Sequence, residues 1–309
     1  PKGEMLTLKT TANLSTGGTA VDITDEVHPA NVHIAERAIR LIGLDIGGVD
    51  IIAPDLTTPI NENGGGIVEI NAAPGFRMHL QPTLGLARNV AKPVIDMLFP
   101  PGIRSTIPII AVTGTNGKTT TTRLINHILK VTGSTVGMCT TEGVYIKNRL
   151  VYPGDMTGPM SHRLVLSDPT IDVAVLECAR GGILRSGLGY RECNVGVVTN
   201  ISPDHLGLKG IETLEQLAKV KSVIPQIVRK DGHAILNADD PLVAQMERYV
   251  RGETIFYSLN PQNEIIRDYK KNNGISIVLE DGQVCIYRGP WKYPLLPLND
   301  IPITFDGKA

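Results

Sequence analysis

The segment Ile110-Ala-Val-Thr-Gly-Thr-Asn-Gly-Lys-Thr-Thr120 decides the fold of the larger part of this chain. A hydrophobic run ends in a short turn that carries Gly114 and Gly117, and a stretch with helical spacing opens at Lys118. Small residues in such a turn let backbone N–H groups approach phosphate oxygens, and the amino end of the helix adds partial positive charge. We expect Lys118 to contact the β- and γ-phosphates of a nucleotide, and the Thr119 hydroxyl to reach Mg²⁺.

The loop departs from the strict phosphate-binding motif at one position. The strict form has a glycine five residues before Gly117, where this chain has Val112. The strand, the two turn glycines, the lysine and the threonine nevertheless follow one another in the order that phosphate binding requires. We therefore predict an ATP-binding loop that consists of Gly114, Thr115, Asn116, Gly117, Lys118, Thr119 and Thr120.

Further apolar runs follow the loop at Asp172–Glu177 and Val195–Asn200, and they alternate with helical stretches, the first of which begins at Lys118. Continuous apolar strands between helices are typical of a buried parallel sheet. We therefore predict an α/β domain with a mostly parallel sheet. The last stretch, roughly Glu253–Ile286, is expected to form short strands joined by turns.

The first hundred residues have a different pattern. The spacing of apolar residues predicts a helix at 31–44, followed by strands at Asp45–Ala53 and Gly66–Asn71 that a polar, Asn- and Gly-rich loop joins. Residues 86–99 again have helical spacing. The cluster Phe99-Pro-Pro-Gly102 breaks any helix or strand, and we expect a domain boundary there.

Length and composition limit the possible functions. The 309 residues, 42% of them hydrophobic, suffice for two domains, which we assign to residues 1–100 and 101–309. A net charge of -1 and an aromatic content of 4% give no basis for nucleic acid or an anionic membrane as the main partner. The sequence shows no long apolar stretch, no signal peptide and no CxxC pair among its four cysteines. We expect a cytoplasmic protein with reduced thiols.

Acidic and amide side chains come together in the first domain. Glu69 and Asn71 lie two residues apart on one predicted strand and therefore face the same way. Asp50, on the neighbouring predicted strand, can complete an all-oxygen site, which is the ligand set that Mg²⁺ prefers. Asp55 is a second candidate for this carboxylate. Magnesium held between these side chains and ATP would neutralise the phosphates during transfer.

The string Thr113-Gly-Thr-Asn-Gly-Lys-Thr-Thr120 resembles the Mur ligase family, together with folylpolyglutamate and cyanophycin synthetases. The resemblance implies that Glu177, at the end of an apolar strand, is a magnesium ligand. It also implies that His205, in the string NISPDHL, helps to hold a second magnesium ion. The carbamylated lysine of these ligases would be Lys221, with Lys219 as the alternative.

The same resemblance extends to the nucleotide and to the catalytic residues. The string LNADDP matches a segment that contacts the adenosine part of ATP, which implies that Asn237 and Asp240 bind it. The expected catalytic residues are Lys118, His205 and Lys221.

The strings Gly48-Val-Asp50 and EINAAPG at Glu69–Gly75 resemble the metal-binding strings in the C-terminal part of ATP-grasp ligases. Upstream, Asn13–Thr19 resembles the glycine-rich loop of that family near the acceptor and phosphate sites. Arg77 and His79 are candidates to bind a carboxylate substrate, although Arg77 could equally form a structural ion pair. The predicted fold is the C-terminal part of an ATP-grasp domain followed by a Mur ligase-like P-loop domain.

An ATP-grasp ending followed directly by a Mur-like core resembles the cyanophycin synthetase family over essentially all 309 residues. The strings NLSTGGTA, EINAAPGFRMH, GDMTGP and RGGILRSG look like those of that family. The resemblance implies an ATP- and Mg²⁺-dependent ligase, a homo-oligomer when full-length, that acts through acyl phosphates. Its ATP-grasp half would add aspartate to a polymer primer, and its Mur-like half would join arginine to the aspartate side chains. Arg180 and Arg185 are candidates to dock this acidic substrate.

Two other functions stay open. Another Mur-type ligase, acting on folylpolyglutamate or a peptidoglycan precursor, would not carry the ATP-grasp strings. An inactive nucleotide-binding module would have no need to retain Lys118, Glu177 and the carboxylates of the first domain. The first part of an ATP-grasp domain and the C-terminal Mur domain are not recognisable in this sequence, so we expect an internal fragment with little activity alone.

Overall fold

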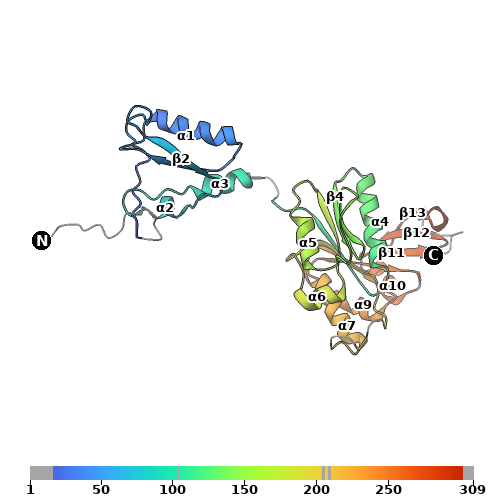
Figure 1. Cartoon of the computed structure of the whole chain (residues 1–309). Coiled ribbons are helices and arrows are strands. Elements are labelled where there is room, and N and C mark those ends of the chain that lie inside the picture. The colour runs from blue at the N-terminus through green and yellow to red at the C-terminus, as the bar shows by residue number, and fades with distance from the viewer. Residues whose placement is uncertain (1–16, 103–104, 204–205, 208–209, 302–309) are drawn as a thin grey trace. The chain divides into compact units, whose positions relative to one another are not determined.

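The computed structural model describes residues 17–102, 105–203, 206–207 and 210–301. The chain divides into two compact units, Pro1–Ser105 and Thr106–Ala309, which we call unit 1 and unit 2 (Figure 1). In the described part of the chain, no helix is long and apolar enough to cross a membrane.

The described part of unit 1 contains an antiparallel pair of strands and three helices. Helix α1 begins after His28, whose ring nitrogen accepts a hydrogen bond from the Ala30 N–H, and it ends at Gly43, where φ is 82°. Strands β1 and β2 pair so that Asp50 lies opposite Glu69 and Gly48 lies opposite Asn71. The elements are α1 (Pro29–Ile42), β1 (Gly48–Ile52), β2 (Gly66–Asn71), α2 (Arg77–Leu80) and α3 (Ala91–Leu98).

The predictions for the first helix and both strands are confirmed, but the prediction of a helix at 86–99 is wrong over its first five residues. Helix α3 begins only at Ala91, and the short helix α2 was not predicted. The physical reason is a set of competing partners: the Leu86 N–H donates to the Asp22 carboxylate, and the Arg88 N–H donates to the His79 carbonyl. Gly85, with φ of 92°, also departs from helical geometry.

Unit 1 is held together by polar contacts. Among its described residues, only Asn31 and Ile60 are buried. The Asn31 amide donates to the carbonyls of Leu56 and Thr58, at 3.1 and 2.8 Å, and its oxygen accepts from the Ile60 N–H at 2.8 Å. This one side chain therefore fixes the loop between β1 and β2.

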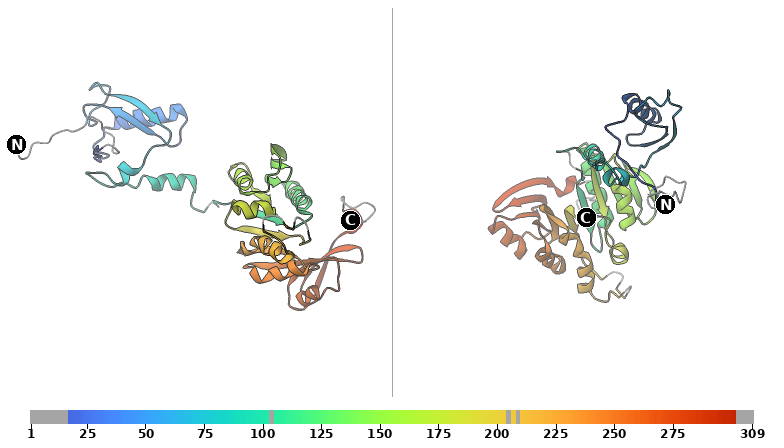
Figure 2. Two further views of the ribbon diagram at one scale, coloured as in Figure 1. Left: turned by 60° about the horizontal axis from the view of Figure 1, so that its bottom comes forward. Right: turned by 90° about the vertical axis from the view of Figure 1, so that its left-hand side faces the viewer.

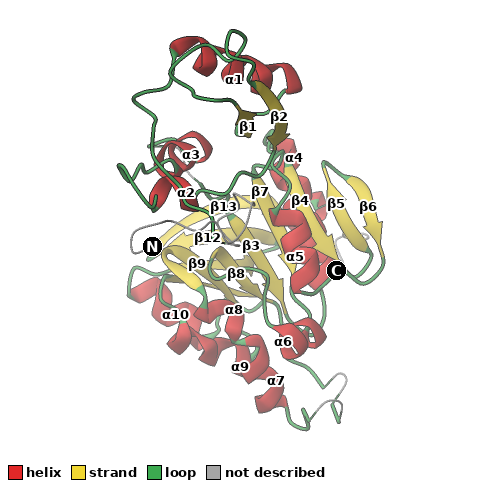
Figure 3. Cartoon of the chain, turned by 60° about the vertical axis from the view of Figure 1, so that its left-hand side comes forward, coloured by secondary structure: helices red, strands yellow, loops and turns green. Residues whose placement is uncertain are grey.

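Unit 2 is built on one sheet of eleven strands (Figure 3). Seven neighbouring strands of this sheet run parallel, in the spatial order β4-β7-β3-β8-β9-β10-β11. Antiparallel strands extend the sheet at both edges, β5 and β6 beyond β4 and β12 and β13 beyond β11. This confirms the prediction of an α/β fold with a mostly parallel sheet. The strands are β3 (Ile109–Thr113), β4 (Val136–Thr140), β5 (Gly143–Ile146), β6 (Arg149–Pro153), β7 (Val173–Glu177), β8 (Cys193–Val198), β9 (Val228–Asn237), β10 (Glu253–Ser258), β11 (Ile275–Glu280), β12 (Gln283–Arg288) and β13 (Trp291–Pro297).

Helices cover both faces of this sheet (Figure 2). Because side chains alternate along a strand, Val173 and Val175 of β7 pack toward α4, while Ala174 and Leu176 pack toward α5. The helices after α5 extend the core on the α5 side. The helices of the described part of unit 2 are α4 (Lys118–Val131), α5 (Pro159–Leu166), α6 (Arg180–Ser186), α7 (Leu214–Lys221), α8 (Val223–Gln226), α9 (Pro241–Ala244) and α10 (Glu264–Lys271).

The prediction for the last part of unit 2 missed a helix, α10. The segment Glu253–Ile286 was expected to contain strands and turns, but α10 lies between β10 and β11. The helix has a single buried residue, Ile266, and its start is capped by the Asn263 side chain. Its apolar residues, Ile265, Ile266 and Tyr269, nevertheless recur with helical spacing, so this stretch carries a helical signal that the prediction missed.

The topology brings four strand ends together. In a parallel sheet the carboxyl ends of neighbouring strands lie along the same edge, and ligands bind there. Strands β7, β3, β8 and β9 are consecutive neighbours. The segments that follow them, including the predicted phosphate loop and Glu177, therefore meet at one edge of the sheet.

Candidate active site

Two glycines give the phosphate loop its shape. Gly114 has φ of 144°, and a Cβ atom there would lie 1.8 Å from the Thr199 hydroxyl oxygen. Gly117 has φ of 79° and immediately precedes α4. Only glycine adopts such backbone angles at low cost, and only a residue without a side chain fits against Thr199. The strand, turn and helix follow one another as the sequence predicted.

The segment that follows β8, residues 199–202, holds this loop in place, and we call it the bracing segment. The N–H groups of Thr115 and Asn116 donate to the backbone and side-chain oxygens of Asn200, at 2.8 and 3.0 Å. The Thr199 hydroxyl donates to the Asn116 carbonyl at 2.7 Å, and the Asn116 amide donates to the Ser202 hydroxyl at 3.1 Å. The N–H groups of Thr115 and Asn116, which we expected to face phosphate, are therefore already hydrogen-bonded within the chain. The N–H groups at the amino end of α4, which have no partner within the helix, are left as the main phosphate donors.

The side chains of α4 point to a metal and phosphate site. The Thr119 hydroxyl donates to Glu177 Oε2 at 2.9 Å, and Lys118 Nζ lies 2.7 Å from the Thr115 carbonyl. Glu177 is fully buried, and its Oε1 has no hydrogen-bond partner among the described residues. Burial raises the pKa of Glu177, although the hydrogen bond from Thr119 and the charge of Lys118 oppose this.

A buried carboxylate oxygen without a partner is costly, unless a ligand supplies the missing interaction. A carboxylate beside a threonine hydroxyl is a donor set that suits Mg²⁺. The residues present at Glu177 and Thr119 therefore fit the magnesium ion that the sequence implied.

A pocket of about 260 Å³ opens beside the loop, lined by Lys118, Asp155, Arg180 and Lys221 among others. Lys221 is buried, and its Nζ lies 2.6 Å from the Gly114 carbonyl. Lys219 is exposed. Of the two lysine candidates, the structure therefore brings only Lys221 to the loop. Asp155, in the GDMTGP string, was not predicted as a site residue.

Arg185 is not part of this pocket. It is exposed, and its guanidinium donates to the Gly181 carbonyl of its own helix at 3.2 Å. Arg180 lines the pocket. Of the two arginines proposed to dock the acidic substrate, the structure therefore places one beside the loop.

Asn237 and Asp240, the predicted adenosine contacts, have hydrogen-bond partners within the chain, and their role in adenosine binding stays a prediction. The Asn237 amide donates to the Thr199 carbonyl at 2.9 Å, and Asp240 accepts from the Ile201 N–H at 2.6 Å. Neither lines the pocket beside the loop. The Tyr257 hydroxyl also donates to the Thr199 carbonyl, at 2.8 Å. These three side chains therefore fix the backbone of the bracing segment at Thr199 and Ile201.

Two predicted features lie outside the described residues. His205, which was expected to help hold a second magnesium ion, is one of them. The first four residues of the glycine-rich string, 13–16, are the other. Both assignments stay predictions.

A buried histidine behind Glu177 was not predicted. His162, on α5, is 1% exposed, and its Nδ1 accepts a hydrogen bond from the Gly189 N–H at 3.2 Å. The proton therefore resides on Nε2, which faces the Glu177 carbonyl at 3.3 Å. Cys178 and Tyr190 complete this cluster. His162 thus connects α5 to the end of β7, which carries Glu177.

Asp50, Glu69 and Asn71, the candidate metal ligands of unit 1, lie close to one another. Asn71 donates through its amide to Asp50 Oδ2 at 3.3 Å and to Glu69 Oε1 at 3.1 Å. Asp55 turns away and accepts hydrogen bonds from Thr57 and Thr58, which lower its pKa. The structure therefore places Asp50, rather than Asp55, beside Glu69.

The substrate candidates of unit 1 lie on α2. Arg77 and His79 are both exposed. His79 lines the pocket that Asp50 and Asn71 also line, whereas Arg77 does not. The pocket is open and lies between α1, β1 and α3.

The geometry of the phosphate loop generates a first prediction. Gly114→Ala is expected to weaken ADP binding by at least about tenfold, roughly 1.4 kcal/mol, because the added methyl displaces Thr199 and the brace. Gly133→Ala is a matched control, since Gly133 also has positive φ, at 93°, but has no atom within 4 Å of an added Cβ. Isothermal titration calorimetry measures both affinities. Equal affinity in the two variants would contradict the bracing role.

The His162 cluster generates a prediction about pH. Burial lowers the pKa of His162 from 6.5 to about 4. The unfolded chain therefore takes up a proton first, and stability is lost as pH falls from about 6.5 toward 4. Burial raises the pKa of Cys178 to about 12 and that of Tyr190 well above its usual range, so both stay neutral over this interval.

His162→Gln, which keeps a donor and an acceptor but does not titrate, should lose less stability over this interval. The difference between the variants can approach roughly 3 kcal/mol. The loss of unfolding free energy is measured by urea unfolding at neutral pH and near pH 4. Glu177 titrates in both proteins, so its contribution cancels in the comparison. Parallel losses of stability would show that His162 does not titrate in this way.

Comparison with known proteins gives the family. Residues 112–287 match the Mur ligase middle domain. The chain is 56% identical over 308 residues to a cyanophycin synthetase from Geminocystis herdmanii (strain PCC 6308), and 54% identical over 309 residues to one from Synechocystis sp. (strain ATCC 27184 / PCC 6803 / Kazusa). Both alignments cover 100% of this chain and 35% of the relative, so the chain spans about a third of the length of these relatives.

A more distant relative is a UDP-N-acetylmuramoylalanine–D-glutamate ligase from Pelotomaculum thermopropionicum (strain DSM 13744 / JCM 10971 / SI). It is 36% identical over 186 residues, which are 60% of this chain and 36% of that protein. The match to the family model covers more than half of the chain and contains the end of β3, α4, Glu177 and the bracing segment. The chain therefore belongs to the Mur ligase middle domain family.

Proposed function

We propose that this chain is part of an ATP-dependent carbon–nitrogen ligase that makes an aspartate polymer with arginine on its side chains. The observation that carries the proposal is the alignment of this chain, over its full length, with cyanophycin synthetases. It is supported by two separate sets of side chains whose chemistry suits magnesium and phosphate. Unit 2 supplies Lys118, Thr119 and Glu177, and unit 1 supplies Asp50, Glu69 and Asn71.

The chemistry proposed for unit 2 is activation of a side-chain carboxylate. A carboxylate is a poor electrophile, but its attack on the γ-phosphate of ATP gives an acyl phosphate and releases ADP. An amine can then attack the acyl carbon, which forms the C–N bond as phosphate leaves. Lys118 would stabilise the charge that develops on the transferred phosphoryl group. Thr119 and Glu177 would hold Mg²⁺, which supplies further neutralisation of the phosphates when bound. Arg180, which lines the same pocket, would orient the acidic substrate.

Lys221 would complete the site of unit 2. Its side chain is buried and reaches the Gly114 carbonyl, so it can act on the loop itself. We propose Lys221, rather than the exposed Lys219, as the lysine that is carbamylated in this family. A carbamate would change this side chain from a cation into an anion, which suits a second hard cation.

The chemistry proposed for unit 1 is activation of the carboxylate at the end of the growing backbone. We propose that unit 1 is the C-terminal part of an ATP-grasp domain, with aspartate as the incoming amine. Asp50, Glu69 and Asn71 lie on one face of the strand pair, as a magnesium site requires. His79, which lines the same pocket, would bind a substrate carboxylate.

The compartment that we propose is the cytoplasm. The four cysteines are unpaired and buried. Free thiols without disulfides are typical of proteins in a reducing environment.

A reciprocal pair of variants in the full-length enzyme tests the division of labour. Lys118→Ala should lower arginine addition to an aspartyl-ended primer by about 100-fold or more, because it removes a main stabiliser of phosphoryl charge. Glu69→Ala should abolish aspartate addition while arginine addition persists. Radiolabelled amino-acid incorporation measures both reactions, and a thermal melt identifies variants that have unfolded. Loss of both reactions in a folded Glu69→Ala enzyme would contradict the assignment of one reaction to each unit.

A further inference from the structure

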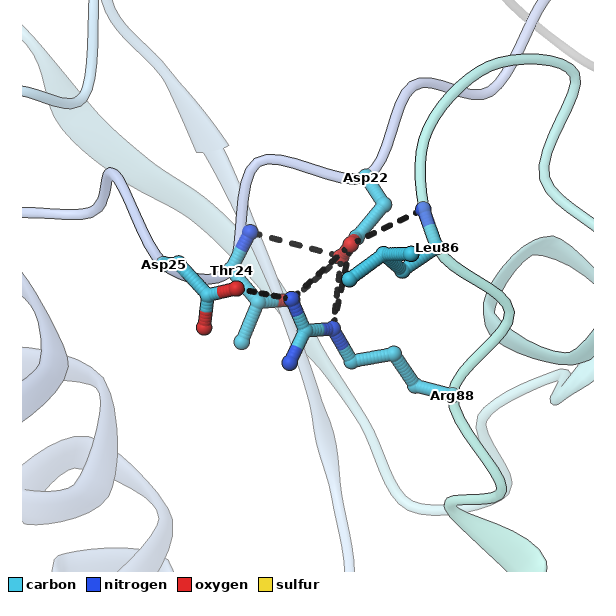
Figure 4. Close-up of polar contacts among 5 residues, drawn as sticks. All are labelled: Asp22, Thr24, Asp25, Leu86 and Arg88. Atoms are coloured by element: carbon cyan, nitrogen blue, oxygen red, sulfur yellow. Dashed lines mark hydrogen bonds and ion pairs between the residues drawn. The ribbon is translucent and has the colours of Figure 1, made fainter.

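Arg88 lies at the centre of a cluster in unit 1 that the proposed reactions do not use (Figure 4). Its Nε donates to both carboxylate oxygens of Asp22, at 3.1 and 3.0 Å, and a terminal nitrogen pairs with Asp25 at 2.6 Å. Asp22 also accepts hydrogen bonds from the Thr24 hydroxyl and the Leu86 N–H. One guanidinium and one carboxylate therefore link two segments that lie more than sixty residues apart.

The backbone of the same two segments is also paired. Asp22 donates through its N–H to the Leu84 carbonyl at 2.9 Å, and Thr83 donates to the Ala20 carbonyl at 2.7 Å. Gly85 lets the chains approach, since a Cβ atom there would lie 2.8 Å from that of Asp22. Ala20 directly follows Gly17-Gly18-Thr19, the described end of the glycine-rich string. The ion pair thus anchors the residues on which that string ends.

Arg88 has a second connection, to α2. Its own N–H donates to the His79 carbonyl at 2.7 Å. His79 lines the pocket that also contains Asp50 and Asn71. Arg88 therefore joins the glycine-rich string to the helix that borders the candidate metal site.

The two acidic partners of Arg88 differ in exposure. The Asp22 side chain is 11% exposed, whereas that of Asp25 is 71% exposed. Exposed ion pairs contribute little because water and salt screen them, and a partly buried pair that also accepts backbone hydrogen bonds contributes more. Asp22 is expected to carry the function of the cluster, and Asp25 is not.

We propose that Arg88 is a positioning residue for aspartate addition: through Asp22 it holds residues 17–22, which include the described end of the glycine-rich string, and through the His79 carbonyl it holds α2, where the carboxylate end of the acceptor chain would bind. This inference rests on the proposed function of unit 1. In this proposal Arg88 acts through Asp22 and the His79 carbonyl, without direct contact with nucleotide or acceptor. A lysine in its place keeps the charge but loses the planar fork that contacts both Asp22 oxygens.

The test uses the full-length enzyme with Arg88→Ala, Arg88→Lys, Asp22→Asn and Asp25→Asn. Lys92→Ala is the matched control, because it removes an exposed ion pair, with Asp96, from the same unit. We expect Arg88→Ala and Asp22→Asn to lower kcat/KM for the primer at least about tenfold, toward the roughly 100-fold that misplaced groups can cost. Arg88→Lys should be intermediate. Asp25→Asn and Lys92→Ala should stay within about twofold of the parent.

Two further readings separate positioning from a general loss of structure. Arginine addition should stay within about twofold of the parent in every variant, because the groups proposed for that reaction lie in unit 2. Hydrogen exchange in peptides covering residues 17–24 should accelerate in Arg88→Ala and Asp22→Asn only. Unchanged primer kinetics in Arg88→Ala would overturn the proposal, as would equal losses in Asp25→Asn or parallel loss of arginine addition.

Failure of the proposed function is distinguishable from failure of this inference. A parent enzyme that adds no aspartate to primer would overturn the proposed function, and the role of Arg88 in acceptor binding with it. The exchange of residues 17–24 would still report whether Arg88 holds the string. A fully active parent with unaltered exchange in Arg88→Ala would overturn the inference alone.

Discussion

The close approach of Gly114 to Thr199 is the constraint on which the site of unit 2 depends. It brings the end of β3 against the end of β8, and the bonds from Asn200 then fix the backbone of the phosphate loop. Three side chains hold that bracing segment: Asn237 at the end of β9, Asp240 at the start of α9 and Tyr257 on β10. The loop is therefore positioned before any nucleotide arrives, so little ordering needs to accompany binding.

The two units reach this organisation by different physical means. Unit 2 has a buried core on both faces of its sheet, and it places the fully buried carboxylate of Glu177 at the edge where the loop lies. The described part of unit 1 has almost no buried residues, and single polar side chains fix its loops instead. Asn31 holds one loop, and Arg88 with Asp22 holds another. Such contacts are directional, so each one positions a specific segment while contributing little bulk stability.

Much of this organisation was predictable from local sequence, because the signals were local. The glycines at 114 and 117, the start of α4 at Lys118 and the face shared by Glu69 and Asn71 follow from residues a few positions apart. The bracing contacts join residues more than eighty positions apart, so no local pattern reveals them. Asn237 and Asp240 matched a nucleotide-binding string, yet their side chains contact the segment after β8. His162 and Arg88 gave no signal, because a single histidine or arginine acquires its role only from the partners that the fold supplies.

The central claim is that Thr119 and Glu177 hold a magnesium ion against a nucleotide bound by the phosphate loop. The most direct measurement is the calorimetric affinity of ADP with and without Mg²⁺, in the parent protein and in Glu177→Gln, which keeps the shape of the side chain but removes its charge. The account predicts that Mg²⁺ tightens ADP binding by at least about tenfold, roughly 1.4 kcal/mol, in the parent, and that Glu177→Gln loses this gain while still binding ADP without metal. An undiminished gain in Glu177→Gln would contradict it.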